Sequence, residues 1–195
     1  MKTKLLFAIV AMATTFTFSG CLKKGEDDPM ISFKSRKARV VGEWKLTAIK
    51  RTSTYSSGTI NSTSVMTGDG STYTSTYTVV DSTTTRTGTL SWDWTLRKDG
   101  TYKYTYTEDG NITTSAGTWN FASGVGDLKN KSQITYYQQS YTNSGSTSTW
   151  TGNYVDDAYD IKELRNKKMV WYEKTTSSST GSNSSYETEM TFKAK

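Results

Sequence analysis

The side chains that most often carry out catalysis are scarce in this sequence. Histidine is absent and Cys21 is the single cysteine, so the chain lacks the usual general base, the commonest zinc ligands and any intramolecular disulfide. Asp156, Asp157 and Asp160 form the one acidic cluster beyond the N-terminal region. Their oxygens could hold calcium, but no glycine-pivoted loop of a calcium motif accompanies them. We therefore expect no metal and no other cofactor.

Two carboxylates for glycoside hydrolysis could come from this cluster or from Asp93 and Glu108. The neighbouring side chains are mostly threonine and serine, which would not raise the pKa of one carboxyl group above that of the other. We expect a protein that is not an enzyme.

The N-terminus has the pattern of a secretion signal. Two lysines precede an apolar run over residues 5–12, which is too short to span a bilayer. Phe18-Ser19-Gly20-Cys21 resembles the lipobox of bacterial lipoproteins, in which small residues precede a cysteine that is diacylated before signal peptidase II cuts in front of it. The resemblance implies that residues 1–20 are removed and that Cys21 carries the acyl chains, palmitate among them. The alternative, a buried thiol or half of a disulfide, finds no second cysteine in the chain.

Residues 21–39 are expected to form a lipidated, solvated tether. Lysines followed by an acidic cluster at Glu26-Asp27-Asp28 resemble the export signal of Bacteroidota-type surface lipoproteins. The resemblance implies display on the outside of the cell outer membrane, and the alternative is an ordinary charged linker facing the periplasm. Anionic headgroups would attract the basic residues of this segment, which are Lys34, Arg36, Lys37 and Arg39.

Composition favours an all-β domain over residues 40–195. Serine and threonine make up roughly a third of the chain and tyrosine is frequent, a balance that favours strands. Removal of residues 1–20 leaves 22 basic against 18 acidic side chains, a net charge of +4. Secretion and the lack of a dense basic stripe argue against nucleic-acid binding.

Strands are predicted wherever residues alternate between turn signals. The clearest case places Leu90, Trp92, Trp94 and Leu96 on one face. The turn Asp99-Gly100 should pair this strand with the next one. The expected strands are residues 44–52, 73–80, 87–97, 101–107, 117–121, 132–142, 148–154, 159–164, 168–175 and 186–194. Strand 168–175 is apolar on both faces at Met169-Val170-Trp171-Tyr172, which indicates a central position. Residues 53–71 and 175–185 have little to bury, which predicts long loops or extended hairpin tips.

The order of these elements resembles the lipocalin-like domains of Bacteroidota lipoproteins. The residues that carry the resemblance are Val41-Gly42-Glu43-Trp44-Lys45-Leu46, Asp99-Gly100-Thr101-Tyr102, Gly117-Thr118-Trp119, Tyr159-Asp160-Ile161 with Leu164, and Met169-Val170-Trp171. The resemblance implies an antiparallel up-and-down barrel of about eight to ten strands. It also implies that Gly42 and Trp44 lie at the barrel base, with Lys193 as a partner of Trp44.

Such a barrel can enclose one small hydrophobic or aromatic ligand. The candidate lining is aromatic and consists of Trp92, Trp94, Tyr102, Tyr104, Trp119 and Trp171. The alternative is that these residues are the ordinary core. Trp150 has no apolar neighbours in the sequence, which suggests an exposed contact with a glycan or a host molecule. Two functions thus stay open: a membrane-anchored binding protein for a small ligand, or a surface interaction protein without an internal ligand.

Overall fold

The structure is a computed structural model that describes residues 34–123, 132–143 and 145–195, with the backbone alone for residues 150–157. One short helix precedes ten strands, which are α2 (Arg36–Val40), β1 (Gly42–Ser57), β2 (Ile60–Gly68), β3 (Thr72–Val79), β4 (Ser82–Leu96), β5 (Thr101–Glu108), β6 (Asn111–Ser123), β7 (Ser132–Asn143), β8 (Ser146–Leu164), β9 (Lys168–Ser179) and β10 (Ser182–Ala194). In the described part of the chain, no helix is long and apolar enough to cross a membrane.

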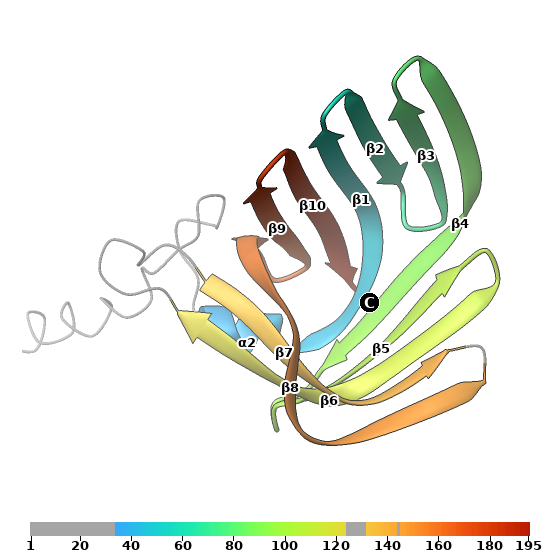
Figure 1. Ribbon diagram of the computed structural model, residues 1–195. Helices are drawn as coiled ribbons and strands as arrows, with labels where there is room; N and C mark the ends of the chain where they lie inside the picture. The colour runs from blue at the N-terminus through green and yellow to red at the C-terminus, as the bar shows by residue number, and fades with distance from the viewer. Residues whose placement is uncertain (1–33, 124–131, 144) are drawn as a thin grey trace, which may run out of the picture.

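The strands form a closed antiparallel barrel in which each strand pairs with its neighbours in sequence and β10 pairs with β1 (Figure 1). The predicted all-β, up-and-down barrel is confirmed, and it is consistent with a lipocalin-like barrel. The hairpin at Asp99-Gly100 is also confirmed, because Leu96 pairs with Tyr102 across this turn. Residues 148–154 and 159–164, predicted as two strands, belong to the single long strand β8.

The barrel narrows at one end because β1 pairs directly with β4 there. Gly42–Lys45 lie opposite Asp93–Leu96, and this places Trp44 beside Trp94. Further along, the hairpin β2–β3 enters between β1 and β4. Eight of the ten strands therefore close the narrow end, and the β2–β3 hairpin adds two more strands to the wall beyond it.

A β-bulge in β1 makes room for this hairpin. The register between β1 and β10 shifts between Leu46 and Ala48. The β2–β3 turn packs onto the bulge at Gly70, which has a φ of 81°. A Cβ on Gly70 would lie 2.1 Å from the carbonyl oxygen of Leu46, so this approach requires glycine. The bulge also resets the alternation of side chains along β1, so that Ile49 and Arg51 point inward.

The narrow half of the barrel is filled by aromatic and aliphatic side chains. Trp94 is 1% exposed, and its ring centroid lies 4.7 Å from that of Tyr104 and 5.0 Å from that of Trp171. The central position predicted for residues 169–172 is confirmed, because β9 pairs there with both β8 and β10. This half is a packed core.

Helix α2 closes the narrow end and corrects one prediction. Arg36 and Arg39, expected to face anionic headgroups, are 7% and 6% exposed. Arg36 donates to Ser132 Oγ at 2.5 Å and to the carbonyl of Ile161 at 3.2 Å, and Arg39 donates to the carbonyl of Leu164. The prediction was wrong for these two arginines because a five-residue helix turns them onto backbone carbonyls of strand β8.

The expected partnership between Lys193 and Trp44 is also wrong. Lys193 lies opposite Lys45 on the exposed face, whereas Trp44 points inward. The indole nitrogen of Trp44 donates instead to the carbonyl of Val40 at 2.8 Å, so helix α2 covers the barrel base.

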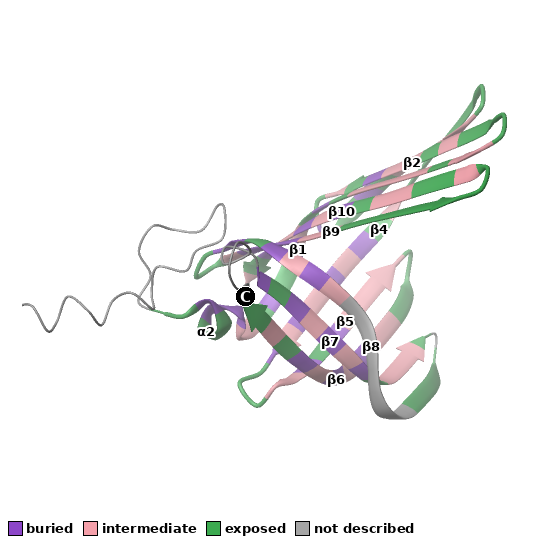
Figure 2. Cartoon of the chain, turned by 60° about the vertical axis from the view of Figure 1, so that its left-hand side comes forward, coloured by how far each residue is buried: buried purple, intermediate pink, exposed green. Residues whose placement is uncertain are grey.

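The wide half becomes a sheet with solvent on both faces, as the exposed residues in Figure 2 show. Ser82–Thr87 of β4 and Lys174–Ser179 of β9 are exposed throughout. Beyond Tyr172, β9 pairs with β10 alone among the described residues. Residues 53–71 and 175–185 are the extended hairpins of this sheet, and β2 is a strand that was not predicted as one. Both faces of these strands carry mostly polar side chains, so the sequence shows no alternation of apolar and polar residues that would predict a strand.

Trp94→Ala should lower the free energy of unfolding by about 3–5 kcal/mol, because it removes a large side chain from a packed core. Urea denaturation followed by circular dichroism measures this change. Ile112→Ala, at a side chain that is 53% exposed, should change it by less than about 0.5 kcal/mol. Equal effects of the two substitutions would contradict the description of the narrow half as core.

Candidate functional site

The six aromatic residues predicted to line a cavity all lie on the inner side of the barrel wall or in its core. They are at most 9% exposed. Trp92 contacts both Trp94 and Tyr104, with ring centroids 5.7 and 5.8 Å apart. The same cluster includes Tyr102 and Trp171. Trp119 is buried outside these ring contacts, and its indole nitrogen donates to the carbonyl of Arg97 at 3.0 Å.

Three indole N–H groups of this cluster lack an acceptor. Trp92, Trp94 and Trp171 each bury Nε1 without a hydrogen-bond partner among the described residues. A buried tryptophan N–H usually finds a partner, and leaving one unsatisfied costs free energy. Trp92 is the one at the border between the packed half and the open half, because its ring lies 5.5 Å from that of the half-buried Tyr106.

Above Trp92 the inner wall includes polar and half-exposed side chains, among them Arg51 and Tyr106. Arg51 lies opposite Thr188 on β10 and opposite Met66 on β2. Its guanidinium lies 5.7 Å from the ring centroid of Tyr186. Tyr106 donates to Glu108 at 2.5 Å. Burial and this hydrogen bond raise the pKa of the Tyr106 hydroxyl well above its ordinary value, while the charge of Arg51 opposes that rise.

A network around Asp109 ties the β5–β6 turn to β3 and β4. The Asp109 carboxylate accepts from the backbone N–H of Thr89 at 2.9 Å and from the hydroxyl of Tyr73 at 2.8 Å, and it forms an ion pair with Arg86. The N–H of Thr89 and the Tyr73 hydroxyl lower the pKa of Asp109, and the charge of Arg86 adds to this. Burial and the bond to Asp109 raise the pKa of Tyr73 to about 12.

Gly88 makes this network possible. A Cβ on Gly88 would lie 2.1 Å from Oδ1 of Asp109 and 2.6 Å from the ring of Tyr73. A hollow of about 440 Å³ opens beside the network, and its lining includes Arg86, Tyr106 and Glu108. Tyr106 therefore borders both this hollow and the surroundings of Arg51.

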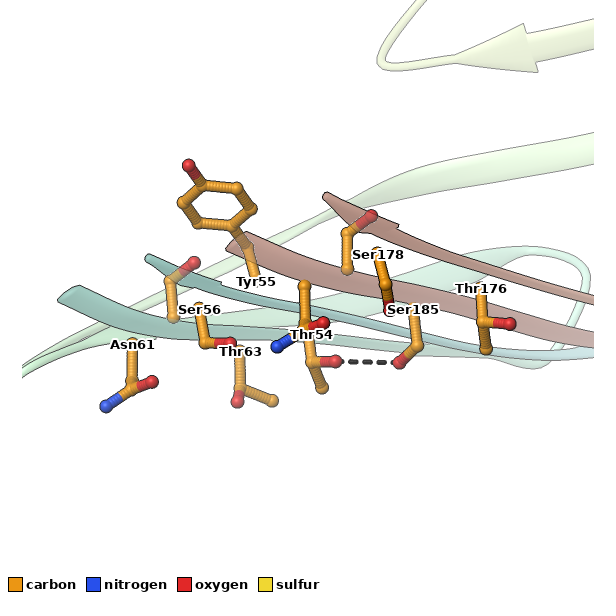
Figure 3. Close-up of a pocket in the computed structure, with 11 residues that line it drawn as sticks. Thr54, Tyr55, Ser56, Asn61, Thr63, Thr176, Ser178 and Ser185 are labelled. Carbon is orange, nitrogen blue, oxygen red and sulfur yellow. Dashed lines mark hydrogen bonds between the residues drawn. The ribbon is translucent and has the colours of Figure 1, made fainter. Parts of the chain in front are cut away.

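A second hollow, of about 420 Å³, lies at the far tips of β1, β2, β9 and β10 (Figure 3). Tyr55 and Thr54 both line it, yet they are sequence neighbours on one strand and point to opposite faces of the sheet. The hydroxyl groups of Thr54 and Ser185 form a hydrogen bond with each other, and their oxygens are 2.7 Å apart. This region is the edge of a single-layer sheet with hydroxyl groups on both sides, and it encloses little.

The remaining predicted positions are placed as follows. Gly42 and Trp44 lie at the narrow end of the barrel, in the segment of β1 that pairs with β4. Cys21 and the side chains of Trp150, Asp156 and Asp157 lie outside the described residues, whereas the carboxylate of Asp160 accepts from Gln133 at 2.9 Å.

Asp93 and Glu108 are not brought together. Asp93 faces outward and lies 3.1 Å from the Lys195 ammonium, whereas Glu108 faces inward beside Tyr106. The described residues contain no group of three or more acidic or cysteine side chains that could hold a metal ion.

Arg51 is the site residue that the sequence analysis missed. A strict alternation from Trp44 and Leu46 would place Lys50 inside and Arg51 outside, and the bulge at Leu46–Ala48 reverses this. The signal that could have revealed it is Ile49, a bulky apolar residue that the unbroken alternation would leave in solvent.

Comparison of the sequence with protein-family models gives no match, and comparisons with curated proteins and with solved structures give none either.

Asp109→Asn should flatten the dependence of stability on acid pH. The pKa of Asp109 is lowered in the folded protein, so its contribution is fully present above the unfolded value of about 3.9 and is lost as the pH falls through the folded value. Asparagine tolerates the positive φ of 49° at this position. Urea denaturation at a series of pH values between 2 and 7 measures the difference.

Tyr73→Phe removes one donor to the same carboxylate and should move the acid limb of the wild-type profile to higher pH. Parallel profiles of Asp109→Asn and wild type below about pH 4 would contradict the proposed electrostatic role of Asp109.

Proposed function

We propose that this protein is a non-catalytic, lipid-anchored binding protein of the cell outer membrane, which takes a small hydrophobic or aromatic ligand at the wide end of its barrel. The observation that carries the proposal is the change of the inner wall at the level of Trp92 and Tyr106. Below this level side chains pack against one another, and above it half-exposed side chains such as Arg51 and Tyr106 lie beside buried ones such as Thr188. A ligand with a flat apolar surface would cover the half-exposed ring of Tyr106 and extend the aromatic cluster.

The closed base supports entry of the ligand from the wide end. Helix α2 covers Trp44, and its two buried arginines bind strand carbonyls at that end. The tilted rings of the cluster keep the interior filled as far as Trp92. The open end is therefore where the barrel offers apolar surface to a small molecule.

Tyr106→Ala should weaken the binding of N-phenyl-1-naphthylamine about tenfold, because it removes apolar contact area of the order of one buried side chain. Fluorescence titration measures this with the full-length protein, kept unacylated by Cys21→Ser. Tyr172→Ala is the matched control, since Tyr172 is half-buried but next to Trp171 on the strand and so faces outward. Lack of binding by the parent protein, or equal losses in the two variants, would refute a ligand site at the wide end.

Anchoring is proposed to depend on Cys21, with the charged segment at Glu26–Asp28 favouring the outer face of the membrane. Cys21→Ser should abolish incorporation of radiolabelled palmitate and release the protein from the membrane fraction, because a serine hydroxyl forms no thioether. Ser19→Ala, which keeps a small residue before the cysteine, should retain both properties. Labelling that survives in Cys21→Ser would exclude this anchor.

A further inference from the structure

Arg51 is a cation on the inner wall without a carboxylate partner among the described residues. Two other arginines of the barrel are neutralised by carboxylates: Arg86 pairs with Asp109, and Arg165 pairs with Glu163. The Nε atom of Arg51 is buried and has no hydrogen-bond partner in the described part of the chain. Glu173 stands in the same row of residues, but Thr188 of β10 lies between them.

The side chains around Arg51 offer several hydrogen-bond donors and few free hydrogen-bond acceptors. Thr188, directly opposite Arg51, is 1% exposed, and its hydroxyl has no partner among the described residues. Trp92, whose Nε1 is likewise unpartnered, is 8% exposed. Tyr106 lies between Trp92 and Arg51 in this group of side chains. Its ring contacts that of Trp92, and the charge of Arg51 acts to lower the pKa of its hydroxyl. Glu108, the nearby acid, already accepts the Tyr106 hydroxyl.

A half-buried guanidinium and buried donors without acceptors are costly unless something satisfies them. An oxyanion meets this demand, because it accepts several hydrogen bonds and neutralises the charge, and a guanidinium binds carboxylates in a planar, two-pronged geometry. The ring of Tyr186, whose centroid lies 5.7 Å from the guanidinium, adds flat apolar surface beside the cation.

We propose that Arg51 binds the acidic group of an aromatic or apolar acid whose ring system lies against Tyr106 and Trp92. This inference rests on the proposed function and deepens it, since it assigns the ligand a negative charge and gives that charge a position. The ligand class is a small organic anion, a carboxylate or a sulfonate, with a planar apolar body.

Two probes that share one skeleton test the charge. 1-Anilinonaphthalene-8-sulfonate carries a sulfonate, and N-phenyl-1-naphthylamine is the same ring system without it. Fluorescence titration of the full-length Cys21→Ser protein should give a lower Kd for the sulfonate. Arg51→Gln should raise the Kd of the sulfonate about tenfold or more and leave that of the neutral probe within about twofold. Lys50→Gln removes the same charge from the exposed face of the same strand and should leave both constants unchanged.

The outcomes separate the two proposals. If the protein binds the neutral probe but Arg51→Gln leaves sulfonate binding unchanged, or Lys50→Gln weakens it equally, the assignment to Arg51 is wrong while the ligand site stands. If neither probe binds, the ligand site itself is refuted and this inference with it. Circular dichroism and urea denaturation of Arg51→Gln establish that the variant is folded, and Arg51→Lys, which keeps the charge, should restore part of the sulfonate affinity.

Discussion

The short ladder between Gly42–Lys45 and Asp93–Leu96 determines the shape of the entire barrel wall. It joins the first strand to the fourth and places Trp44 opposite Trp94. Past this ladder β1 bends at its bulge, and the β2–β3 hairpin fills the space that opens between β1 and β4. A barrel widens with the number of its strands. The eight-stranded end is therefore narrow enough for side chains to fill, whereas the wall spreads apart where the hairpin enters.

The composition of the strands follows this division. In β4 the residues from Leu90 to Leu96 alternate between buried and half-buried, and the six residues from Ser82 to Thr87 are exposed. A sheet with two wet faces gains little from apolar side chains. Threonine suits it because β-branching favours extended backbone while the hydroxyl stays hydrated. Pairs such as Thr78 and Thr83, whose hydroxyls lie 3.1 Å apart, extend the cross-strand contacts without a core.

This division also sets what could be predicted from the sequence. Strands of the narrow half carry an apolar period, so the run from Leu90 to Leu96 and its hairpin partner were correctly predicted. The strand β2 has no such period, so the sequence could not distinguish an extended hairpin from a loop in this segment. Helix α2 is five residues long, too short for a periodic signal. Its arginines look like tether residues until the strand carbonyls that they bind are placed in space.

Only part of the candidate site could be predicted from the sequence, for the same reason. Trp92 and Tyr104 follow the regular alternation and were identified as inward-facing, but alternation alone could not distinguish a lining residue from a core residue. Arg51 was hidden by an irregularity, because one extra residue in β1 inverts every side chain beyond it. The bulge thus does two things at once: it admits the hairpin that widens the barrel, and it turns a guanidinium into the space that the hairpin opens. Without the bulge, the wide end would present Lys50 and Thr52 to the interior, and Arg51 would join the exposed cations of the outer surface.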